Sequence, residues 1–546
     1  MSSRTAADAL VESLECEGVE RIFGLPGEEN MPVLDRLLGS PIDFVTTRHE
    51  QGAAFMADVH GRLTGRAGVC LATLGPGATN LLTGVADANM DHAPVVALAG
   101  QAASTRLHKE SHQVLDLQNL FEPVTKFSSR VVAPETVPEV VRRAFRKAEA
   151  VKPGASFIEL PENLMKMGCD TPTLAPHAIA MQVAADDALD AVAKRIKHAR
   201  RPLVLAGNGV VRARAAEALA GFARAWNLPV ANTFMAKGVI PFRDTLALGS
   251  IGLQSQDFVN FGFDRSDLII CVGYDLVEYP PRLWNPDGAR PVIHIDEESA
   301  EIDQYYRVCD ELVGDLAFSL AELTARADPR EDWQVGRLRQ QLIDDMNEHA
   351  ADTSVPLKPQ KLIWDLRTAA KLDAVMITDV GAHKLWMARM FRCEQPNTCL
   401  ISNGFASMGI ALPGAIAACL VHPGREVVAV TGDAGFLMNV QELETAVRLG
   451  LSFVVLIWND SAYGLIEWKQ QREYGREAFA RFGNPDFVRL AEAFGATGVR
   501  IEGGDSLEKA LTEAFSRDGI TVIDCPVDYS ENLRLTERLG ELVCPF

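Results

Sequence analysis

The sequence predicts an α/β fold built from three doubly wound parallel-sheet domains. Strand-like apolar runs alternate with helical patterns along the chain, which is typical of βαβ units and parallel sheets. Two softer stretches, residues 167–187 and 351–360, interrupt this alternation. A length of 546 residues is enough for about two to four domains. We therefore expect an N-terminal domain over residues 1–168, a middle domain over 188–345 and a C-terminal domain over 358–546.

Composition narrows the class of function. Hydrophobic residues make up 47% and charged residues 23% of the chain, as in ordinary globular proteins. The formal net charge of −20 argues against nucleic acid or an anionic membrane as partner. The sequence has neither an apolar run of transmembrane length nor a signal-peptide pattern. The 10 cysteines form no CxxC pair, which favours free thiols in a reducing compartment. We expect a cytoplasmic protein that acts on a small molecule.

The interval from residue 426 to residue 464 predicts a strand, a turn, a helix and a second strand. The apolar run EVVAVTG ends at Asp433, and the run FVVLIWN ends just before Asp460. Between them, residues 439–450 carry apolar side chains at helical spacing. Parallel strands end at one edge of their sheet, where such sheets bind ligands. The two aspartates are therefore expected to lie together at that edge.

Two carboxylates at one sheet edge suit a hard divalent cation such as Mg²⁺, which also bridges phosphate oxygens. Gly432, directly before Asp433, allows close approach of the backbone. The helix that follows offers free N–H groups to a diphosphate. Taken alone, the segment favours the simpler interpretation of two strand-end aspartates that cap a helix and a turn.

The text GDA followed at this interval by ND resembles the diphosphate–metal motif of thiamin-diphosphate (ThDP) enzymes. The resemblance implies that Mg²⁺ is held by the Asp433 and Asp460 side chains and the Ala462 carbonyl. It also implies cofactor contacts at neighbouring positions of the same motif: Gly432, Ala434, Tyr463 and Gly464. A further stretch, TDVGAHKLW, is similar to the family's diphosphate contact and adds Gly381 and His383.

The text TTRHEQGAA predicts a strand that delivers Glu50 to the start of a helix. Alone, Glu50 is a favourable charge at a helix N-terminus. In the ThDP family, the glutamate of this motif bonds to the aminopyrimidine ring and promotes loss of the thiazolium C2 proton. The GPG turn that follows contains Gly75 and leads to Asn80. It is either a tight turn with an asparagine cap or, by resemblance, a neighbour of the pyrimidine.

The stretch NGFASMGIA places Met408 at a helix start, where a methionine is ordinarily a core residue. By resemblance, Met408 bends the cofactor, and the Ala406 carbonyl and Met408 amide bind the pyrimidine edge. These motifs occur in family order over nearly the whole chain. They are similar to the decarboxylase–carboligase branch, which implies a homodimer or dimer of dimers with active sites at the subunit interface.

The residues around position 113 bear on the type of reaction. Pyruvate decarboxylases carry a His-His pair here, whereas this chain has His112 and Gln113. Gln113 and Lys126 resemble the corresponding residues of acetolactate synthases. A neutral glutamine can orient a carbonyl but is a poor proton donor, which favours carboligation. We expect two pyruvate to give 2-acetolactate and CO₂.

Other functions stay open at this point. Glu28 stands where acetolactate synthases have small neutral residues and pyruvate decarboxylases have aspartate. It is either a solvated loop residue or a proton relay in a 2-oxo acid decarboxylase that releases an aldehyde. A carboligase with another acceptor is a further alternative. A ThDP-binding homologue without turnover is disfavoured because Glu50, Asp433 and Asp460 are retained.

The middle segment bears on FAD. The GxG turn at residues 207–209 is a weak dinucleotide signal, and we interpret it as structural. Biosynthetic acetolactate synthases bind a non-catalytic FAD and carry an arginine at about the position of Glu278. The text of residues 272–285, and Asp460 in place of asparagine, resemble the catabolic FAD-independent kind. We therefore expect no FAD. Trp468 falls one position away from the tryptophan that sets acceptor preference in the biosynthetic enzymes, and we interpret it as packing.

Overall fold

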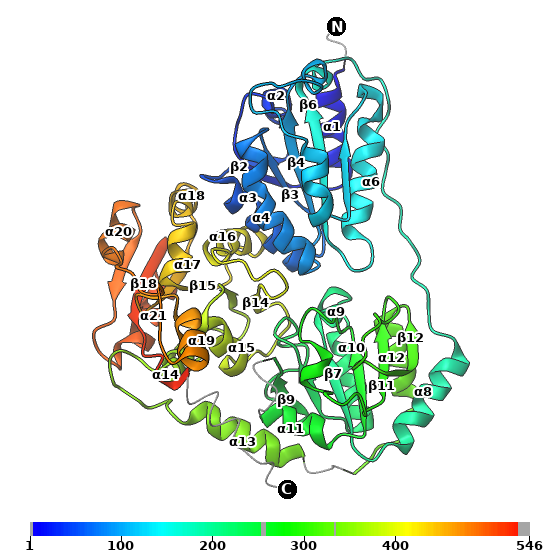
Figure 1. The fold of residues 1–546 in the computed structure, drawn as a ribbon, viewed down its shortest axis with the longest axis vertical. Coiled ribbons are helices and arrows are strands. Elements are labelled where there is room, and N and C mark those ends of the chain that lie inside the picture. Colours follow the sequence, from blue (N-terminus) through cyan, green and yellow to red (C-terminus); the bar gives the residue numbers. More distant parts are fainter. Residues whose placement is uncertain (1–3, 253–257, 332–334, 533–546) are drawn as a thin grey trace. The chain divides into compact units, whose positions relative to one another are not determined.

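The computed structural model describes residues 4–252, 258–331 and 335–532 (Figure 1). These residues form three six-stranded sheets, and the strand pairings within each sheet are parallel. Helices follow most strands, as expected when both faces of a parallel sheet are covered. The predicted α/β class with three doubly wound parallel sheets is confirmed. Among the described residues, every helix is too short or too polar to cross a membrane.

The chain divides into two compact units. Unit 1 comprises Met1–Ile179, Gly404–Pro423 and Met438–Leu451, and unit 2 comprises Ala180–Asn403, Gly424–Leu437 and Ser452–Phe546. Unit 1 holds the first sheet, and unit 2 holds the second and third sheets. One hydrophobic cluster of unit 2 includes side chains from both of its sheets, among them Leu203, Cys271, Val430 and Leu456. The domain boundaries at residues 168, 188, 345 and 358 stay predictions.

The sheet of unit 1 has the strand order β2-β1-β3-β4-β6-β5. Its strands are β1 (Arg21–Gly24), β2 (Asp43–Thr46), β3 (Gly68–Ala72), β4 (Val95–Gln101), β5 (Phe127–Arg130) and β6 (Ala155–Pro161). The three central strands β3, β4 and β6 are buried along their whole length, which explains their continuous apolar text. The helices are α1 (Ala6–Cys16), α2 (Met31–Leu37), α3 (Glu50–Thr64), α4 (Pro76–Met90), α5 (Leu117–Phe121), α6 (Val137–Glu149), α7 (Glu162–Met165), α16 (Ala411–Val421) and α18 (Glu442–Arg448).

Helices α3 and α4 pack against each other, and they carry Glu50 and Asn80. The strand before α3 ends at Thr46, and α3 begins at Glu50 with the His49 side chain as its cap. The GPG turn starts α4, because Gly75 adopts a φ of 53° and Pro76 takes the first helical position. The later helix α16 packs against α3. Unit 1 thus gathers residues that lie far apart in the sequence.

The second sheet has the order β12-β11-β10-β7-β8-β9 and the third the order β14-β13-β15-β16-β18-β17. The second sheet consists of β7 (Pro202–Ala206), β8 (Val230–Asn232), β9 (Ala247–Ser250), β10 (Leu268–Val272), β11 (Val292–Asp296) and β12 (Val308–Val313). The third consists of β13 (Val375–Thr378), β14 (Cys399–Ile401), β15 (Val427–Gly432), β16 (Phe453–Asn459), β17 (Thr497–Arg500) and β18 (Ile520–Pro526).

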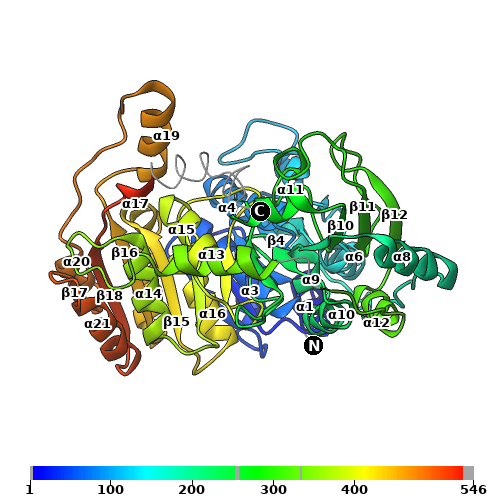
Figure 2. The same ribbon diagram turned by 90° about the horizontal axis from the view of Figure 1, so that it is seen from below.

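The helices of unit 2 are α8 (Asp186–His198), α9 (Asn208–Arg212), α10 (Ala216–Trp226), α11 (Phe258–Arg265), α12 (Leu316–Ala325), α13 (Val335–Asn347), α14 (Pro359–Ala369), α15 (Ala382–Met390), α17 (Asp433–Met438), α19 (Gly464–Tyr474), α20 (Phe487–Ala493) and α21 (Ser506–Phe515). Helices α14 and α21 pack side by side beside the third sheet (Figure 2).

One expected helix differs from the structure. The predicted helix over residues 439–450 is shorter, because α17 begins directly at Asp433 and α18 covers only Glu442–Arg448. Between them, the Asn439 side chain donates a hydrogen bond from Nδ2 to the Gly409 carbonyl at 2.8 Å. This bond ties Asn439 to the loop before α16, and Asn439 lies between the two helices. The segment with helical spacing is therefore interrupted at Asn439.

Candidate active site

Strands β15 and β16 bring Asp433 and Asp460 to one edge of the third sheet. The two strands are parallel neighbours, with Gly432 opposite Trp458 in register. The Asp433 side chain is only 1% exposed. Its Oδ1 accepts the Ala434 amide at 2.8 Å, and its Oδ2 accepts the Ser461 amide at 2.7 Å. The predicted edge position of both aspartates is therefore what the structure shows.

Within the described part of the chain, these two carboxylates have no cationic partner from the protein. Across residues 4–252, 258–331 and 335–532, no lysine or arginine forms an ion pair with either of them. Burial raises the pKa of Asp433, and burial followed by the charge of Asp433 raises the pKa of Asp460 to about 7. A bound divalent cation would relieve this repulsion and hold both groups ionised.

The side chains present would not complete a metal site alone. Within the described ranges, no group of three or more His, Cys, Asp or Glu residues is placed to hold a metal. Two carboxylates, the Ala462 carbonyl and oxygens from a diphosphate would make a suitable oxygen set for Mg²⁺. The donor set thus fits a metal that arrives with a phosphorylated cofactor.

His383, Gly381 and Gly432 meet beside this pair. His383 is 3% exposed, and burial lowers the pKa of its imidazole to about 3, so the ring is neutral. Its Nε2 is buried and has no hydrogen-bond partner among the described residues. A Cβ on Gly381 would lie 2.8 Å from the His383 ring, and a Cβ on Gly432 would lie 3.3 Å from it. This close packing requires glycine at both positions. The unpaired imidazole nitrogen could bond to a ligand atom such as a diphosphate oxygen.

Gly464 and Tyr463 begin α19, next to Asp460. A Cβ on Gly464 would collide with Asp460 Oδ2. Tyr463 is 40% exposed, whereas Ala462 is buried and pairs with Arg481 through an isolated bridge. The predicted motif residues Ala462, Tyr463 and Gly464 therefore all lie next to Asp460.

Asn484 also contacts Asp433, and it was not predicted from the sequence. Its Nδ2 donates to Asp433 Oδ2 at 2.7 Å and to Asn459 Oδ1 at 3.1 Å. The loop that carries Asn484 lies 51 positions beyond Asp433, so no local spacing announces the contact. Asn484 thus holds Asp433 Oδ2, whereas the Ala434 amide holds Oδ1.

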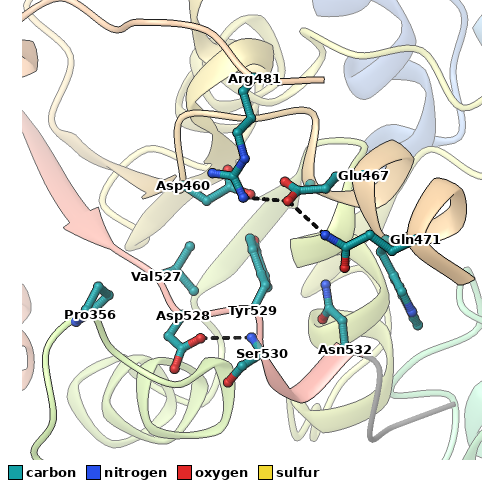
Figure 3. Close-up of a pocket in the computed structure, with 12 residues that line it drawn as sticks. Pro356, Asp460, Glu467, Gln471, Arg481, Val527, Asp528, Tyr529, Ser530 and Asn532 are labelled. Atoms are coloured by element: carbon teal, nitrogen blue, oxygen red, sulfur yellow. Dashed lines mark hydrogen bonds and ion pairs between the residues drawn. The ribbon is translucent and has the colours of Figure 1, made fainter. Parts of the chain in front are cut away.

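A cavity of about 450 Å³ opens beside Asp460 (Figure 3). Glu467 of α19 lines it and bonds to both Arg481 and Gln471 (Figure 3). Tyr529 stacks on Trp458 at a centroid distance of 6.2 Å. Burial, and then the charges of Asp460 and Asp433, hold the pKa of Tyr529 well above its usual range. Sequence reasoning missed these lining residues because they come from separate segments.

Trp468 also lines this cavity and is 9% exposed. It belongs to the hydrophobic cluster of unit 2, in keeping with its interpretation as a packing residue.

In unit 1, Glu50 and Asn80 form the centre of a second group of predicted residues. Glu50 is 8% exposed, and its Oε2 accepts the Asn80 side-chain amide at 2.9 Å. A Cβ on Gly77 would lie 3.4 Å from Glu50 Oε1, so the GPG turn runs close past the carboxyl group. The structure therefore brings the glutamate and the turn together.

Glu442 of α18 holds the chain just before Glu50. It is fully buried, and its Oε1 accepts the amides of Arg48 at 3.1 Å and His49 at 3.0 Å. A Cβ on Gly52 would lie 2.7 Å from the same oxygen. In the sequence, this helix appears only as the connection between two strands, and Glu442 gives no sign of a distant partner.

Gln113 lies against the GPG turn. It adopts a φ of 58° and is exposed within unit 1. A Cβ on Gly75 would lie 2.9 Å from the Gln113 Cβ. Gly75 and Gln113, predicted from separate motifs, are thus neighbours.

Glu28 and Lys126 have surroundings of different kinds. Glu28 is exposed, whereas its neighbour Glu29 accepts a hydrogen bond from the Thr73 hydroxyl at 2.8 Å. Lys126 Nζ donates to the carbonyls of Val151 at 3.2 Å and Lys152 at 2.7 Å. These two bonds fasten the loop before β6. The roles expected for Glu28 and Lys126 stay predictions.

Ala406 and Met408 lie in the loop before α16. Ala406 adopts a φ of 56°, in the left-handed region, and Met408 is half-buried. Asp91 Oδ1 accepts the Gly404 amide at 2.5 Å, and Asp87 Oδ1 accepts the Ser407 amide at 3.2 Å. Asp87 lies in the last turn of α4 and Asp91 is the C-cap of the same helix, so the loop is attached to the helix that follows the GPG turn.

The GxG turn at residues 207–209 packs closely against its neighbours. A Cβ on Gly209 would lie 2.5 Å from the Gly273 Cα. Glu278 is 7% exposed, and its Oε1 accepts the Asn208 amide at 2.9 Å. Burial, and then the charge of Asp275, raise the pKa of Glu278 to about 8. A dinucleotide phosphate at this turn would meet the carboxyl of Glu278, which disfavours a nucleotide there.

Three family models match the chain. They are the N-terminal TPP binding domain of thiamine pyrophosphate enzymes over residues 4–120, the central domain over 189–323 and the C-terminal TPP binding domain over 379–525. Thiamine pyrophosphate (TPP) is another name for ThDP.

Whole-length relatives agree with these matches. An acetolactate synthase of Bacillus subtilis is 39% identical over 550 residues, which cover 98% of this chain and 96% of the relative. A catabolic acetolactate synthase of Raoultella terrigena is 38% identical over 543 residues, covering 98% and 97%. An acetolactate synthase large subunit of Parasynechococcus marenigrum is 33% identical over 551 residues, covering 97% and 88%.

Proposed function

Because the chain belongs to the thiamine pyrophosphate enzyme family, we propose that it is a ThDP- and Mg²⁺-dependent acetolactate synthase. It would convert two pyruvate into 2-acetolactate and CO₂. The observation that carries this proposal over a simple decarboxylase is the neutral Gln113 beside Gly75 of the GPG turn. The names of the relatives support it, at identities below 40%.

The third-sheet residues would hold the diphosphate and its metal. Asp433 and Asp460 would bind Mg²⁺ through their carboxylates, and the Ala462 carbonyl would add a third protein oxygen. The buried Nε2 of the neutral His383 would donate to a phosphate oxygen. Gly381 and Gly432 would keep the backbone close to the diphosphate.

Unit 1 would hold the pyrimidine. When bound, ThDP supplies a carbon nucleophile that adds to a 2-oxo acid carbonyl and accepts the electron pair released with CO₂. Glu50 would hold a proton at the ring nitrogen it faces, with Asn80 fixing the Glu50 carboxyl at 2.9 Å. Met408 would press on the cofactor, and the Ala406 carbonyl and Met408 amide would bind the pyrimidine edge.

Gln113 would select the fate of the two-carbon unit left after CO₂ departs. Its amide can donate a hydrogen bond to the carbonyl of a second pyruvate and cannot deliver a proton readily. We propose that this favours carbon–carbon bond formation over protonation, and that Lys126 contributes to acceptor binding.

A second candidate function is a 2-oxo acid decarboxylase that releases an aldehyde. The exposed Glu28 favours it, because a carboxyl group can act as a proton relay where glutamine cannot. A carboligase with another acceptor is a third possibility.

The assembly and cofactor content are proposed alongside the reaction. We propose a homodimer or dimer of dimers in which a pyrimidine half and a diphosphate half from different subunits complete each site. We also propose that the protein binds no FAD, because the carboxyl of Glu278 fills the GxG turn. A purified protein without a flavin absorption band would agree, and a tightly bound flavin would refute this part.

Product analysis tests the reaction. The purified protein, supplied with ThDP, Mg²⁺ and pyruvate alone, should form one acetolactate and one CO₂ for every two pyruvate consumed. Acetaldehyde equal to CO₂ would refute the synthase and support the decarboxylase. Gln113→Ala should raise the acetaldehyde share, and Glu28→Gln should leave it unchanged. If Glu28→Gln instead lowers acetaldehyde and CO₂ together, the relay function is supported.

A further inference from the structure

A buried cluster of four charged side chains joins the second half of α3 to the carboxyl end of α4. Arg62 Nε bonds to Asp58 Oδ1 at 2.6 Å, and Arg62 Nη2 lies 3.2 Å from Asp87 Oδ2 and 2.9 Å from Asp91 Oδ2. All three aspartate side chains are 0% exposed and the Arg62 side chain is 10% exposed. Three acids therefore share one guanidinium inside unit 1.

Such a cluster is costly for a purely structural element. Buried ion pairs rarely stabilise a fold more than apolar packing of similar volume does. Here the acids outnumber the base, and burial raises the pKa of Asp58 despite the nearby Arg62. Asp87 and Asp91 also lie at the carboxyl end of α4, where the helix dipole disfavours negative charge. Both burial and the helix dipole therefore disfavour the negative charges of this cluster.

The oxygens that face away from Arg62 bind the loop of Ala406. Asp91 Oδ1 accepts the Gly404 amide at 2.5 Å, and Asp87 Oδ1 accepts the Ser407 amide at 3.2 Å. The Ser407 N–H belongs to the same peptide group as the Ala406 C=O. A trans peptide is planar, with N–H and C=O directed to opposite sides. Asp87 therefore sets the direction in which the Ala406 carbonyl points.

We propose that Asp87, held by Arg62, is a positioning residue that orients and polarises the Ala406–Ser407 peptide toward the aminopyrimidine of ThDP. A charge-assisted hydrogen bond on the N–H makes the carbonyl of the same peptide a stronger acceptor. The left-handed φ of 56° at Ala406 is disfavoured for alanine, so the loop needs such an anchor. This inference rests on the ThDP site of the proposed function and is independent of which product the enzyme releases.

The test compares Asp87→Asn with Asp87→Ala in the full-length protein, without substrate. Two quantities are measured: the Kd for ThDP at saturating Mg²⁺, by calorimetry, and the rate at which the C2 proton of bound ThDP exchanges with D₂O, by quenched-flow NMR. Asparagine keeps an oxygen for the Ser407 N–H but removes the charge, whereas alanine removes both.

Asp87→Asn should bind ThDP within about threefold of wild type and exchange the C2 proton about tenfold more slowly, a change of about 1.4 kcal/mol. Asp87→Ala should show the slower exchange and also bind ThDP about tenfold more weakly. Asp365→Asn is a matched control, because Asp365 is also 0% exposed and pairs with Lys361 at 2.7 Å in α14 of unit 2. It should change neither quantity.

Wild-type exchange in Asp87→Asn, at wild-type affinity, would overturn the proposal. Equal slowing in Asp365→Asn would overturn it as well, since a general loss of stability would then explain the effect. If Asp87→Ala fails to fold, the separation of exchange rate from affinity in Asp87→Asn still decides. Because both readouts precede turnover, failure of the acetolactate assay would leave the outcome of this test unaffected.

Discussion

Replacing Asp460 by asparagine should stabilise the metal-free protein. The folded state raises the pKa of Asp460 from its ordinary 3.8 to about 7, through burial and the charge of Asp433. At about 1.4 kcal/mol per pKa unit, this corresponds to about 4 kcal/mol as an upper limit. Asp460 is partly exposed, and solvent screening reduces the expected gain to roughly 2 kcal/mol.

The pH dependence follows from the direction of the shift. Below about pH 4 the carboxyl is protonated in both the folded and unfolded states, so Asp460 costs nothing there. Between about pH 4 and pH 7 the unfolded state loses its proton first, so wild-type stability falls as pH rises. The variant lacks this group, and its advantage should grow through the same window and level off above about pH 7.

The assay is thermal unfolding in EDTA at pH 4.0, 5.5 and 8.0, repeated at pH 8.0 with Mg²⁺ and ThDP. In EDTA, D460N should unfold at a higher temperature than wild type at pH 8.0, with the gap closing at pH 4.0. Adding Mg²⁺ and ThDP should reverse the order, because only the wild type keeps both carboxylate ligands.

The neighbouring Asp528 provides a control of opposite sign. Its pKa is lowered through hydrogen bonds to Lys358 and Ser530, which outweigh its desolvation. Asp528→Asn should therefore lose stability above about pH 4. The reasoning is that the two buried carboxylates destabilise the fold when no metal is bound. It would be refuted if D460N in EDTA were no more stable than wild type at pH 8.0.

Three further predictions concern the remaining site residues. Glu50→Gln should lower turnover by about 10²–10⁴-fold, which is the usual contribution of a positioned acid or base. ThDP should still bind in a calorimetric titration. A variant with normal turnover would exclude Glu50 from the chemistry. Gly381→Ala should abolish ThDP binding, because the added Cβ would lie 2.8 Å from the His383 ring, whereas Gly483→Ala, which has no atom within 4 Å, should bind normally. Glu442→Ala should lower the unfolding temperature, since each buried amide left without its acceptor costs about 1–3 kcal/mol. Glu442→Gln keeps the acceptor oxygen and should lower the unfolding temperature less. Equal decreases in the two variants would contradict this reasoning.

The sequence was sufficient for the fold class and for local motif geometry. Apolar runs buried on both faces, such as β4 and β16, produce a continuous apolar text that predicts parallel strands. Asp433 and Asp460 could be placed at one sheet edge, because parallel neighbours end together. The split of the helix at Asn439 was missed, since the cause is a side-chain bond to Gly409, 30 positions away in the sequence.

Within the candidate site, the residues whose role depends on their covalent neighbours could be identified from the sequence. A glycine before a strand-end aspartate, or a proline after a glycine with positive φ, is a local property of the chain. The distant groups that orient these residues could be identified only from the folded chain. Three hydrogen bonds illustrate this. Asn484 bonds to Asp433 across 51 positions, Glu442 to the His49 amide across 393, and Asp87 to the Ser407 amide across 320. Hydrogen bonds of this kind depend on packing between separate elements, and no periodicity along the chain encodes them.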